Sequence, residues 1–195
     1  MPVALSKGEN VSLTREDPGL TQIQIGLGWQ TRETDGDDFD LDASAFLLDA
    51  DGKVTGDADF VFYNNLVSPC GSLVHAGDNL TGAEGGTVQD AETVKLNITM
   101  LPSVIERVAI CVSIHMAEIR QQNFGMVGGA YIRVINEKTG HEIARFDLSE
   151  DASVETAMIF GEIYRYGGEW KFRATAQGFP GGLGELARYF GVNVE

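Results

Sequence analysis

The sequence predicts a mainly β fold, a β-sandwich of two antiparallel sheets with a few short helices and long acidic loops. Most apolar stretches alternate apolar with polar residues, which is the spacing of a strand that buries one face. The 195 residues include 24 glycines and only five prolines, a balance that favours tight turns over long helices. Strands at this spacing, separated by glycine-rich turns, are typical of two-sheet sandwiches.

The expected strands follow one another along the whole chain. The first covers residues 20–29, and the second covers residues 39–48, where Phe39, Leu41, Ala43, Ala45 and Leu47 share one face. The run 107–115 is almost continuously apolar and is expected to be buried on both faces. Further strands are expected at 60–63, 94–100, 130–135, 142–148, 158–166 and 170–176, the last four as two hairpins around NEKTG (136–140) and GGE (167–169).

Two short helices are expected, at residues 116–124 and 183–190. The chain contains no linker, low-complexity tract or break in composition. We therefore predict a single domain spanning residues 1–195.

The formal net charge of −15 argues against binding to nucleic acid or to anionic membranes and favours cations and basic partners. No apolar stretch approaches the roughly 18 residues of a membrane span, and the first residues lack the apolar core of a signal peptide. We expect a cytoplasmic protein. Cys111 is expected to be a buried thiol and Cys70 an exposed one, and the sequence leaves open whether they form a disulfide.

The segment from residue 35 to residue 42 carries five carboxylates in eight positions. On a strand, Asp38, Asp40 and Asp42 point the same way, with neighbours about 6.5 to 7 Å apart. No lysine or arginine within the segment offsets their repulsion, whereas a bound divalent cation would. A hard cation such as Ca²⁺ takes six to eight oxygen ligands. A solvated acidic loop is the alternative.

An EF-hand is excluded for this segment. Asp38, Asp40, Asp42 and Asp49 fall at the right positions, but Ala43 stands where the loop requires glycine, and the flanks are not helical. Any metal site must therefore combine several loops.

A second acidic stretch, residues 77–92, is a long glycine-rich loop, and such loops are usually functional or disordered. A third oxygen-rich stretch, residues 57–65, surrounds the expected strand at 60–63. The candidate ligands in the second stretch are Asp78, Asn79, Glu84, Asp90 and Glu92.

Catalytic motifs are weakly supported. The three histidines, His75, His115 and His141, do not combine with cysteine or serine into a known nucleophile pattern or a zinc site. The glycines from residue 182 match a dinucleotide motif, but too little chain follows to complete a βαβ unit. We expect no enzyme activity.

The chain resembles the tellurium-resistance TerD family, also called TerD/TerE stress proteins, from residue 5 to its end. Six motifs in the same order carry this resemblance. They are GLGW (26–29), DFDLDASAF (38–46), DFVFYNN (59–65), HAGDN (75–79), FDLSEDA (146–152) and EWKFR (169–173).

The resemblance implies a β-sandwich that binds Ca²⁺ through acidic loops at one end, in a cytoplasmic stress protein whose partners are other stress-response proteins. It implies metal ligation by Asp38, Asp40, Asp42, Asp78, Asn79 and Glu92, to which Glu84 and Asp90 are added from their place in the same loop.

The chain departs from the family pattern at Gln30, where aspartate is usual, at Cys70, where an Asp-Gly turn is usual, and in a thinner acidic loop. We therefore expect one or two Ca²⁺ ions. The alternatives are a metal-dependent enzyme with the cation as Lewis acid, and a metal-free scaffold with a solvated acidic rim.

Overall fold

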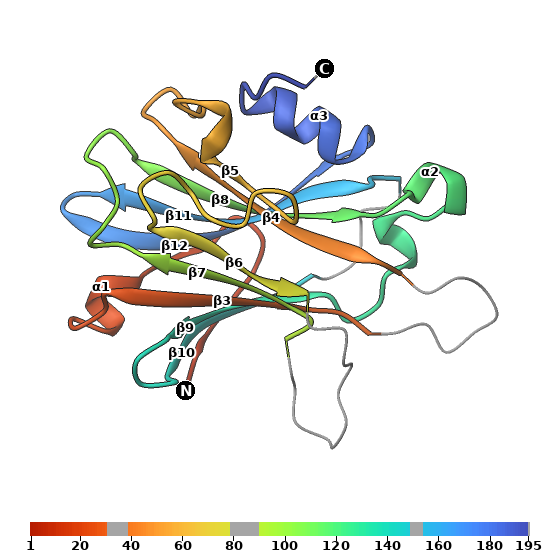
Figure 1. Ribbon diagram of the computed structural model, residues 1–195. Helices are drawn as coiled ribbons and strands as arrows, with labels where there is room; N and C mark the ends of the chain where they lie inside the picture. Colours follow the sequence, from red (N-terminus) through yellow and green to blue (C-terminus); the bar gives the residue numbers. More distant parts are fainter. Residues whose placement is uncertain (31–38, 79–89, 149–153, 195) are drawn as a thin grey trace.

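Two six-stranded sheets face one another in the computed structural model, which describes residues 1–30, 39–78, 90–148 and 154–194 (Figure 1). Sheet A has the strand order β1-β10-β9-β3-β7-β6, and sheet B has the order β2-β12-β11-β8-β4-β5. The expected sandwich is confirmed.

Sheet A is antiparallel except at one edge, where β1 runs parallel to β10 with Val3 opposite Ala144. The expected sandwich of antiparallel sheets therefore has one parallel pair, at this edge of sheet A. No hairpin sets the direction of β1, because the chain continues from it across to sheet B. The strands of sheet A are β1 (Val3–Leu5), β10 (Glu142–Asp147), β9 (Tyr131–Asn136), β3 (Gln22–Gly28), β7 (Glu92–Asn97) and β6 (Leu73–Asp78).

Sheet B is antiparallel throughout the described strands. Its two central strands are β11 and β8. β11 and β12 form one of the two hairpins expected from the sequence. The strands of sheet B are β2 (Asn10–Ser12), β12 (Glu169–Phe179), β11 (Ala157–Tyr166), β8 (Arg107–Ile114), β4 (Leu41–Leu48) and β5 (Phe60–Val61).

The helices are short, as expected. The helix expected at 116–124 is a single turn, because Met116 and Gln121 on either side of it adopt left-handed φ values of 53° and 52°. None of the helices among the described residues is long and apolar enough to cross a membrane. The helices are α1 (Leu13–Glu16), α2 (Ala117–Arg120) and α3 (Gly182–Tyr189), with 3-10 turns η1 (Asp57–Asp59) and η2 (Phe124–Met126).

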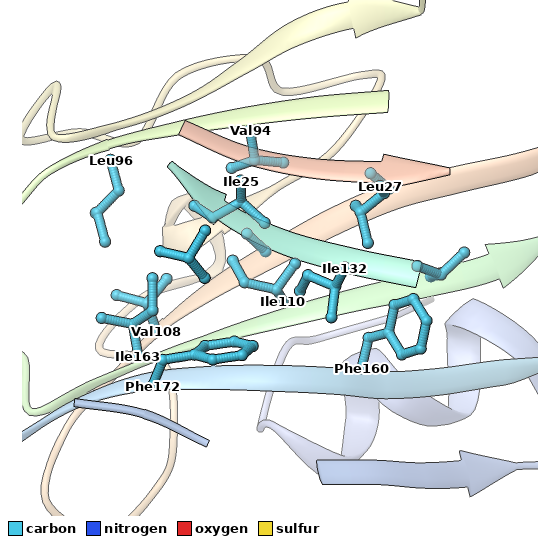
Figure 2. Packing of buried hydrophobic residues seen from close by; sticks show 14 of the residues in the cluster. Ile25, Leu27, Val94, Leu96, Val108, Ile110, Ile132, Phe160, Ile163 and Phe172 are labelled. Atoms are coloured by element: carbon cyan, nitrogen blue, oxygen red, sulfur yellow. The ribbon is translucent and has the colours of Figure 1, made fainter. Parts of the chain in front are cut away.

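The main core lies between the sheets. Figure 2 shows Ile25 and Ile132 of sheet A directed towards Ile110, Phe160 and other residues of sheet B. The alternating residues expected to share one face of β4, from Phe39 to Leu47, are all buried in this core. Burial of these alternating faces is the main stabilising term of such a fold.

A second core covers the outer face of sheet B beneath α3. The Phe46 ring stacks on Phe60 with centroids 4.4 Å apart and lies 4.6 Å from Phe190. Ala109 and Cys111 of β8 join this cluster, whereas their neighbours in β8 enter the main core. The continuous apolar run of β8 therefore reflects burial on both faces, as predicted.

Both cysteines are free thiols, which answers the question that the sequence left open. Cys111 is buried, as expected, whereas Cys70 is partly buried rather than exposed. Its Sγ lies 2.9 Å from the Ser72 Oγ and 3.5 Å from the Ser68 Oγ.

Candidate metal site at the strand ends

The strand ends that border the acidic segments gather at one end of the sandwich. In sheet A, β6 ends at Asp78, which is opposite Glu92 at the start of β7. In sheet B, β4 begins at Leu41, which is opposite Ile114 at the end of β8. In Figure 1, the start of β4 and the end of β8 lie on the right, and the end of β6 and the start of β7 lie near the centre. The acidic segments 31–38 and 79–89, which continue from them in the sequence, lie outside the described residues.

The carboxylates at the start of β4 have partners from α2 and from the connection that leads to it from β8. The Asp42 Oδ2 is 3.6 Å from the His115 Nδ1, and the Asp40 Oδ2 is 4.0 Å from an Arg120 Nη1. The His115 backbone N–H also donates to the Asp40 carbonyl oxygen at 2.7 Å. The sequence segment itself contains no neutralising cation, but the fold supplies one from about 80 residues further along the chain.

A buried pair, His75 and Glu92, lies beside them. The His75 Nε2 is 3.2 Å from the Glu92 Oε2, and both side chains are about 95% buried. The hydrogen bond with Glu92 raises the pKa of His75 against the opposing effect of burial, and the charges of Glu92 and Asp42 and a hydrogen bond with the Ala43 backbone act in the same direction. The pair therefore connects the edge of sheet A to β4 of sheet B.

This pair was not recognised in the sequence, although a signal for half of it exists. Glu92, Val94 and Leu96 alternate with partly buried positions in β7, and all three are buried. The alternation thus places Glu92 on the inward face. It does not identify His75 as the partner, because β6 was not among the expected strands.

Asp90 has a different set of partners. The Arg133 guanidinium binds it through two hydrogen bonds of 2.7 and 2.9 Å, and the Tyr131 hydroxyl donates to it at 3.1 Å. Burial raises the pKa of Tyr131 to about 12, with the Asp90 charge contributing. Arg133 also reaches Glu142 at 3.2 Å. Asp90, near the end of the second acidic stretch, is thus held in a buried ion pair with Arg133.

Two glycines of the GLGW motif make room for this ion pair on the outer face of sheet A. Gly26 is opposite Arg133 and Gly28 is opposite Tyr131 in the register of β3 with β9. A Cβ at Gly26 would lie 2.0 Å from an Asp90 carboxylate oxygen, and one at Gly28 would lie 2.4 Å from the Tyr131 ring. Both positions therefore require glycine for packing.

The third oxygen-rich stretch, residues 57–65, is used in turns. The Asp59 carboxylate accepts hydrogen bonds from the backbone N–H and the hydroxyl of Thr55. The Asn65 amide donates to the carbonyl oxygens of Ala58 and Phe60 at 3.1 and 2.7 Å. These groups shape the chain around β5.

The predicted ligands are thus only partly described. Asp40, Asp42, Asp90 and Glu92 lie near the same end, whereas Asp78 is placed only as the last residue of β6. Asp38, Asn79 and Glu84 lie outside the described residues. Within residues 1–30, 39–78, 90–148 and 154–194, no group of three or more His, Cys, Asp or Glu side chains could hold a metal ion. Calcium binding stays a prediction.

Gln30 is held against a glycine turn. Its backbone N–H donates to the Gly128 carbonyl oxygen at 2.9 Å. A Cβ at Gly129, which has a left-handed φ of 60°, would lie 2.7 Å from the Gln30 side chain. The Gln30 side chain, which stands where aspartate is usual in the family, therefore occupies the space that Gly128 and Gly129 leave.

Comparisons with known proteins agree with the fold and the motifs. A TerD domain matches residues 1–190. The chain is 53% identical to tellurium resistance protein TerD of Serratia marcescens over 193 residues, which is 99% of both chains. It is 50% identical to general stress protein 16U of Bacillus subtilis (strain 168) over 195 residues, the whole of both chains.

A solved structure shares the fold. The crystal structure of a homologue of telluride resistance protein (TerD) from Streptomyces coelicolor A3(2) superposes with a TM-score of 0.61 at 22% identity. The superposition covers 87% of this chain and 95% of that one. Together, the domain match and the full-length relatives show that the chain belongs to the TerD family of tellurium-resistance and stress proteins.

Proposed function

We propose that this chain is a calcium-binding stress-response protein of the tellurium-resistance type, in which the metal orders the acidic connections and so forms a surface for a partner protein. The observation that carries the proposal is the position of Asp40 and Asp42. They lie at the end of the sandwich where β6 ends and β7 begins. In the sequence, the segment 31–38 before β4 contains four carboxylates, and the segment 79–89 between β6 and β7 contains one.

The chemistry of the described donors fits a hard cation in part. Asp40 is half exposed, and its ion-pair contact with Arg120 is longer than a hydrogen bond, as is the contact of Asp42 with His115. Two carboxylates supply too few of the six to eight oxygens that calcium takes. We assign the remaining ligands to the predicted residues of the connecting segments, Asp38, Asp78, Asn79 and Glu84.

Asp90 and Glu92 are assigned supporting roles in this proposal. Asp90 is held by Arg133 through two hydrogen bonds, and Glu92 is buried against His75. Removing either carboxylate from its partner would leave a buried charge uncompensated, which costs about 3 to 5 kcal/mol. Both residues instead fix the ends of strands from which the predicted ligands extend. A bound calcium ion would supply the positive charge that offsets the repulsion among the remaining carboxylates.

We infer a binding module rather than an enzyme. Each histidine has a carboxylate within 4.0 Å, namely Glu92 for His75, Asp42 for His115 and Asp17 for His141. A general base for covalent catalysis would instead need a serine or cysteine within hydrogen-bond reach.

The test is thermal unfolding of the purified chain in excess Ca²⁺, in excess Mg²⁺ and in chelator. A ligand at a hundredfold excess over its Kd adds about 2.7 kcal/mol, which for a domain of this length raises Tm by about 5 to 10 °C. We expect this rise with Ca²⁺ alone. Identical curves in all three conditions would contradict the proposal and favour a solvated acidic rim.

A matched pair of variants locates the site. Replacing Asp40 and Asp42 by Asn should abolish calorimetric Ca²⁺ binding while leaving the fold intact in chelator, because the repulsion between the two carboxylates falls. Asp51→Asn removes an exposed carboxylate from the loop after β4 and should leave the affinity unchanged. Unchanged affinity in the double variant would place the metal elsewhere.

A further inference from the structure

A second polar site lies on the outer face of sheet B. A pocket of about 380 Å³ opens there beside the C-terminal end of α3. Residues of β8, β11 and β12 line it, together with the loop residues 51–53, Tyr189 at the end of α3 and Phe190 directly after it. Arg107 lines the pocket at the start of β8, whereas Ile114 at the other end borders the acidic strand ends. Seven residues of strand, about 23 Å, separate the two.

Two arginines share one buried carboxylate in this pocket. The Arg107 Nη1 is 3.2 Å from the Glu162 Oε1, and the Arg173 Nη2 and Nε are 2.6 and 3.2 Å from the Glu162 Oε2. The Glu162 side chain is only 6% exposed, whereas each arginine side chain is 39% exposed. In the described part of the chain, no other carboxylate lies within 4.0 Å of either guanidinium.

The pocket is therefore positive in a strongly negative protein. Lys53, Arg107 and Arg173 line it against Asp51 and Glu162, three positive charges against two negative ones, while the whole chain carries −15. One arginine is enough to neutralise Glu162, so the second guanidinium leaves a positive charge without a compensating carboxylate. Low-dielectric walls such as those of a pocket strengthen the attraction of an anion to such a charge.

The cationic groups are also held in place before any ligand arrives. Glu162 accepts hydrogen bonds from both guanidiniums and so holds them in place. The Arg173 guanidinium also lies 5.2 Å from the centre of the Tyr164 ring. Lys53 donates from its Nζ to the Tyr189 carbonyl oxygen at the end of α3. Side chains that are already ordered lose less conformational entropy on binding, and the planar guanidinium matches two oxygens of an oxyanion at once.

We propose that this pocket binds a small oxyanion with two negative charges, of the phosphate type, through Arg107 and Arg173 with Lys53 at the rim. The volume exceeds that of an inorganic ion and leaves space for a small organic group attached to it. The shared chemistry is the doubly charged oxyanion, and its source is either a free ion or a phosphate monoester. The site is separate from the proposed calcium ligands.

The experiment is calorimetric titration of the full chain, freed of divalent cations, with inorganic phosphate, with tellurite and with glycerol phosphate. An ionic strength of about 0.1 M screens the overall negative charge beyond about 10 Å while leaving contacts inside the pocket intact. Saturable binding of either inorganic ion identifies a free oxyanion. Binding of glycerol phosphate alone identifies a phosphorylated metabolite. The absence of binding with all three probes at millimolar concentration would overturn the proposal.

Substitutions attribute the binding to the pocket. Arg107→Gln should weaken the affinity at least tenfold, and the fold should persist because Glu162 keeps Arg173 as its partner. Arg173→Gln is the second variant and should have a similar effect. Arg145→Gln is the control, since Arg145 pairs with Asp147 in β10 of sheet A, and its affinity should match the wild type. An unchanged affinity in both pocket variants would refute the assignment. Because calcium is absent throughout, the outcome does not depend on the proposed calcium site.

Discussion

Gly26→Ala tests whether the GLGW motif serves the ion pair on the outer face of sheet A. The added Cβ would lie 2.0 to 2.5 Å from three atoms of the Asp90 carboxyl group, distances that real structures do not contain. The carboxylate must therefore move, and it cannot move without losing the two-point contact with Arg133. The perturbation acts on a contact more than 60 residues away in the sequence.

The magnitude follows from the burial of the pair. The Asp90 side chain is 5% exposed and the Arg133 side chain is 21% exposed, so breaking the contact leaves a charge that is mostly removed from water. Loss of one partner of such a pair costs about 3 kcal/mol, at the lower end of the range for buried pairs because the guanidinium keeps some solvent. For a chain of this length, that lowers Tm by about 6 to 12 °C.

The assay is a double-mutant cycle measured by denaturant unfolding in chelator, with Gly26→Ala, Asp90→Ala and the double variant. Without the carboxylate the clash disappears, so Gly26→Ala should cost less than about 1 kcal/mol in the Asp90→Ala background. The coupling between the two sites should be about 2 kcal/mol. If Gly26→Ala lowered the free energy of unfolding equally in the two backgrounds, the reasoning would be refuted. The requirement for glycine would then come from backbone conformation alone.

Two further predictions concern ionisable groups. Because Glu92 raises the pKa of His75, the stabilisation from protonated His75 is fully present below about pH 6.5 and is lost as the pH rises through the raised value. The difference in the free energy of unfolding between the wild type and His75→Gln, measured in chelator, should therefore shrink from about pH 6 to pH 9. A difference that stays constant over this range would contradict the prediction. Burial raises the pKa of Cys111 well above its usual value, whereas at Cys70 hydrogen bonds with two serines outweigh burial and lower the pKa. A thiol reagent should modify one cysteine of the folded chain at neutral pH and both after unfolding, and a Cys70→Ser variant that still reacts rapidly would refute this assignment.

The long strands of the fold could be predicted because their own residues carry the pattern. Residues 39–48 alternate and residues 107–115 are continuously apolar, and both became central strands of sheet B. The three-residue strands β1 and β2 and the strand β6 were missed. A three-residue strand is too short to show a period, and β6 contains His75, Gly77 and Asp78, which interrupt its apolar pattern.

The candidate site could be predicted only as a set of carboxylates. Like charges on one strand are visible in the sequence, but their partners are not, since Arg120 reaches Asp40 from a different connection. The same limit applies to Asp90, whose contact with Arg133 depends on the register of β3 with β9 and on Gly26 between them. The clustering of acidic residues in the sequence thus predicts where a site lies. Which of those residues are ligands and which are ion-pair partners depends on the three-dimensional arrangement.

The two short N-terminal strands have a consequence for how the chain folds during synthesis. β1 occupies an edge of sheet A by pairing with residues 144–146, and β2 occupies an edge of sheet B by pairing with residues 171–173. Both short strands therefore pair with strands more than 130 residues later in the sequence. Sheet A lacks a strand until β10 (Glu142–Asp147) has been synthesised, and sheet B lacks one until β12 (Glu169–Phe179) has been synthesised. Until then, unpaired strand edges stay open to other chains. Closing these two edges therefore depends on contacts between residues far apart in the sequence, and such contacts form slowly because a long loop must close first.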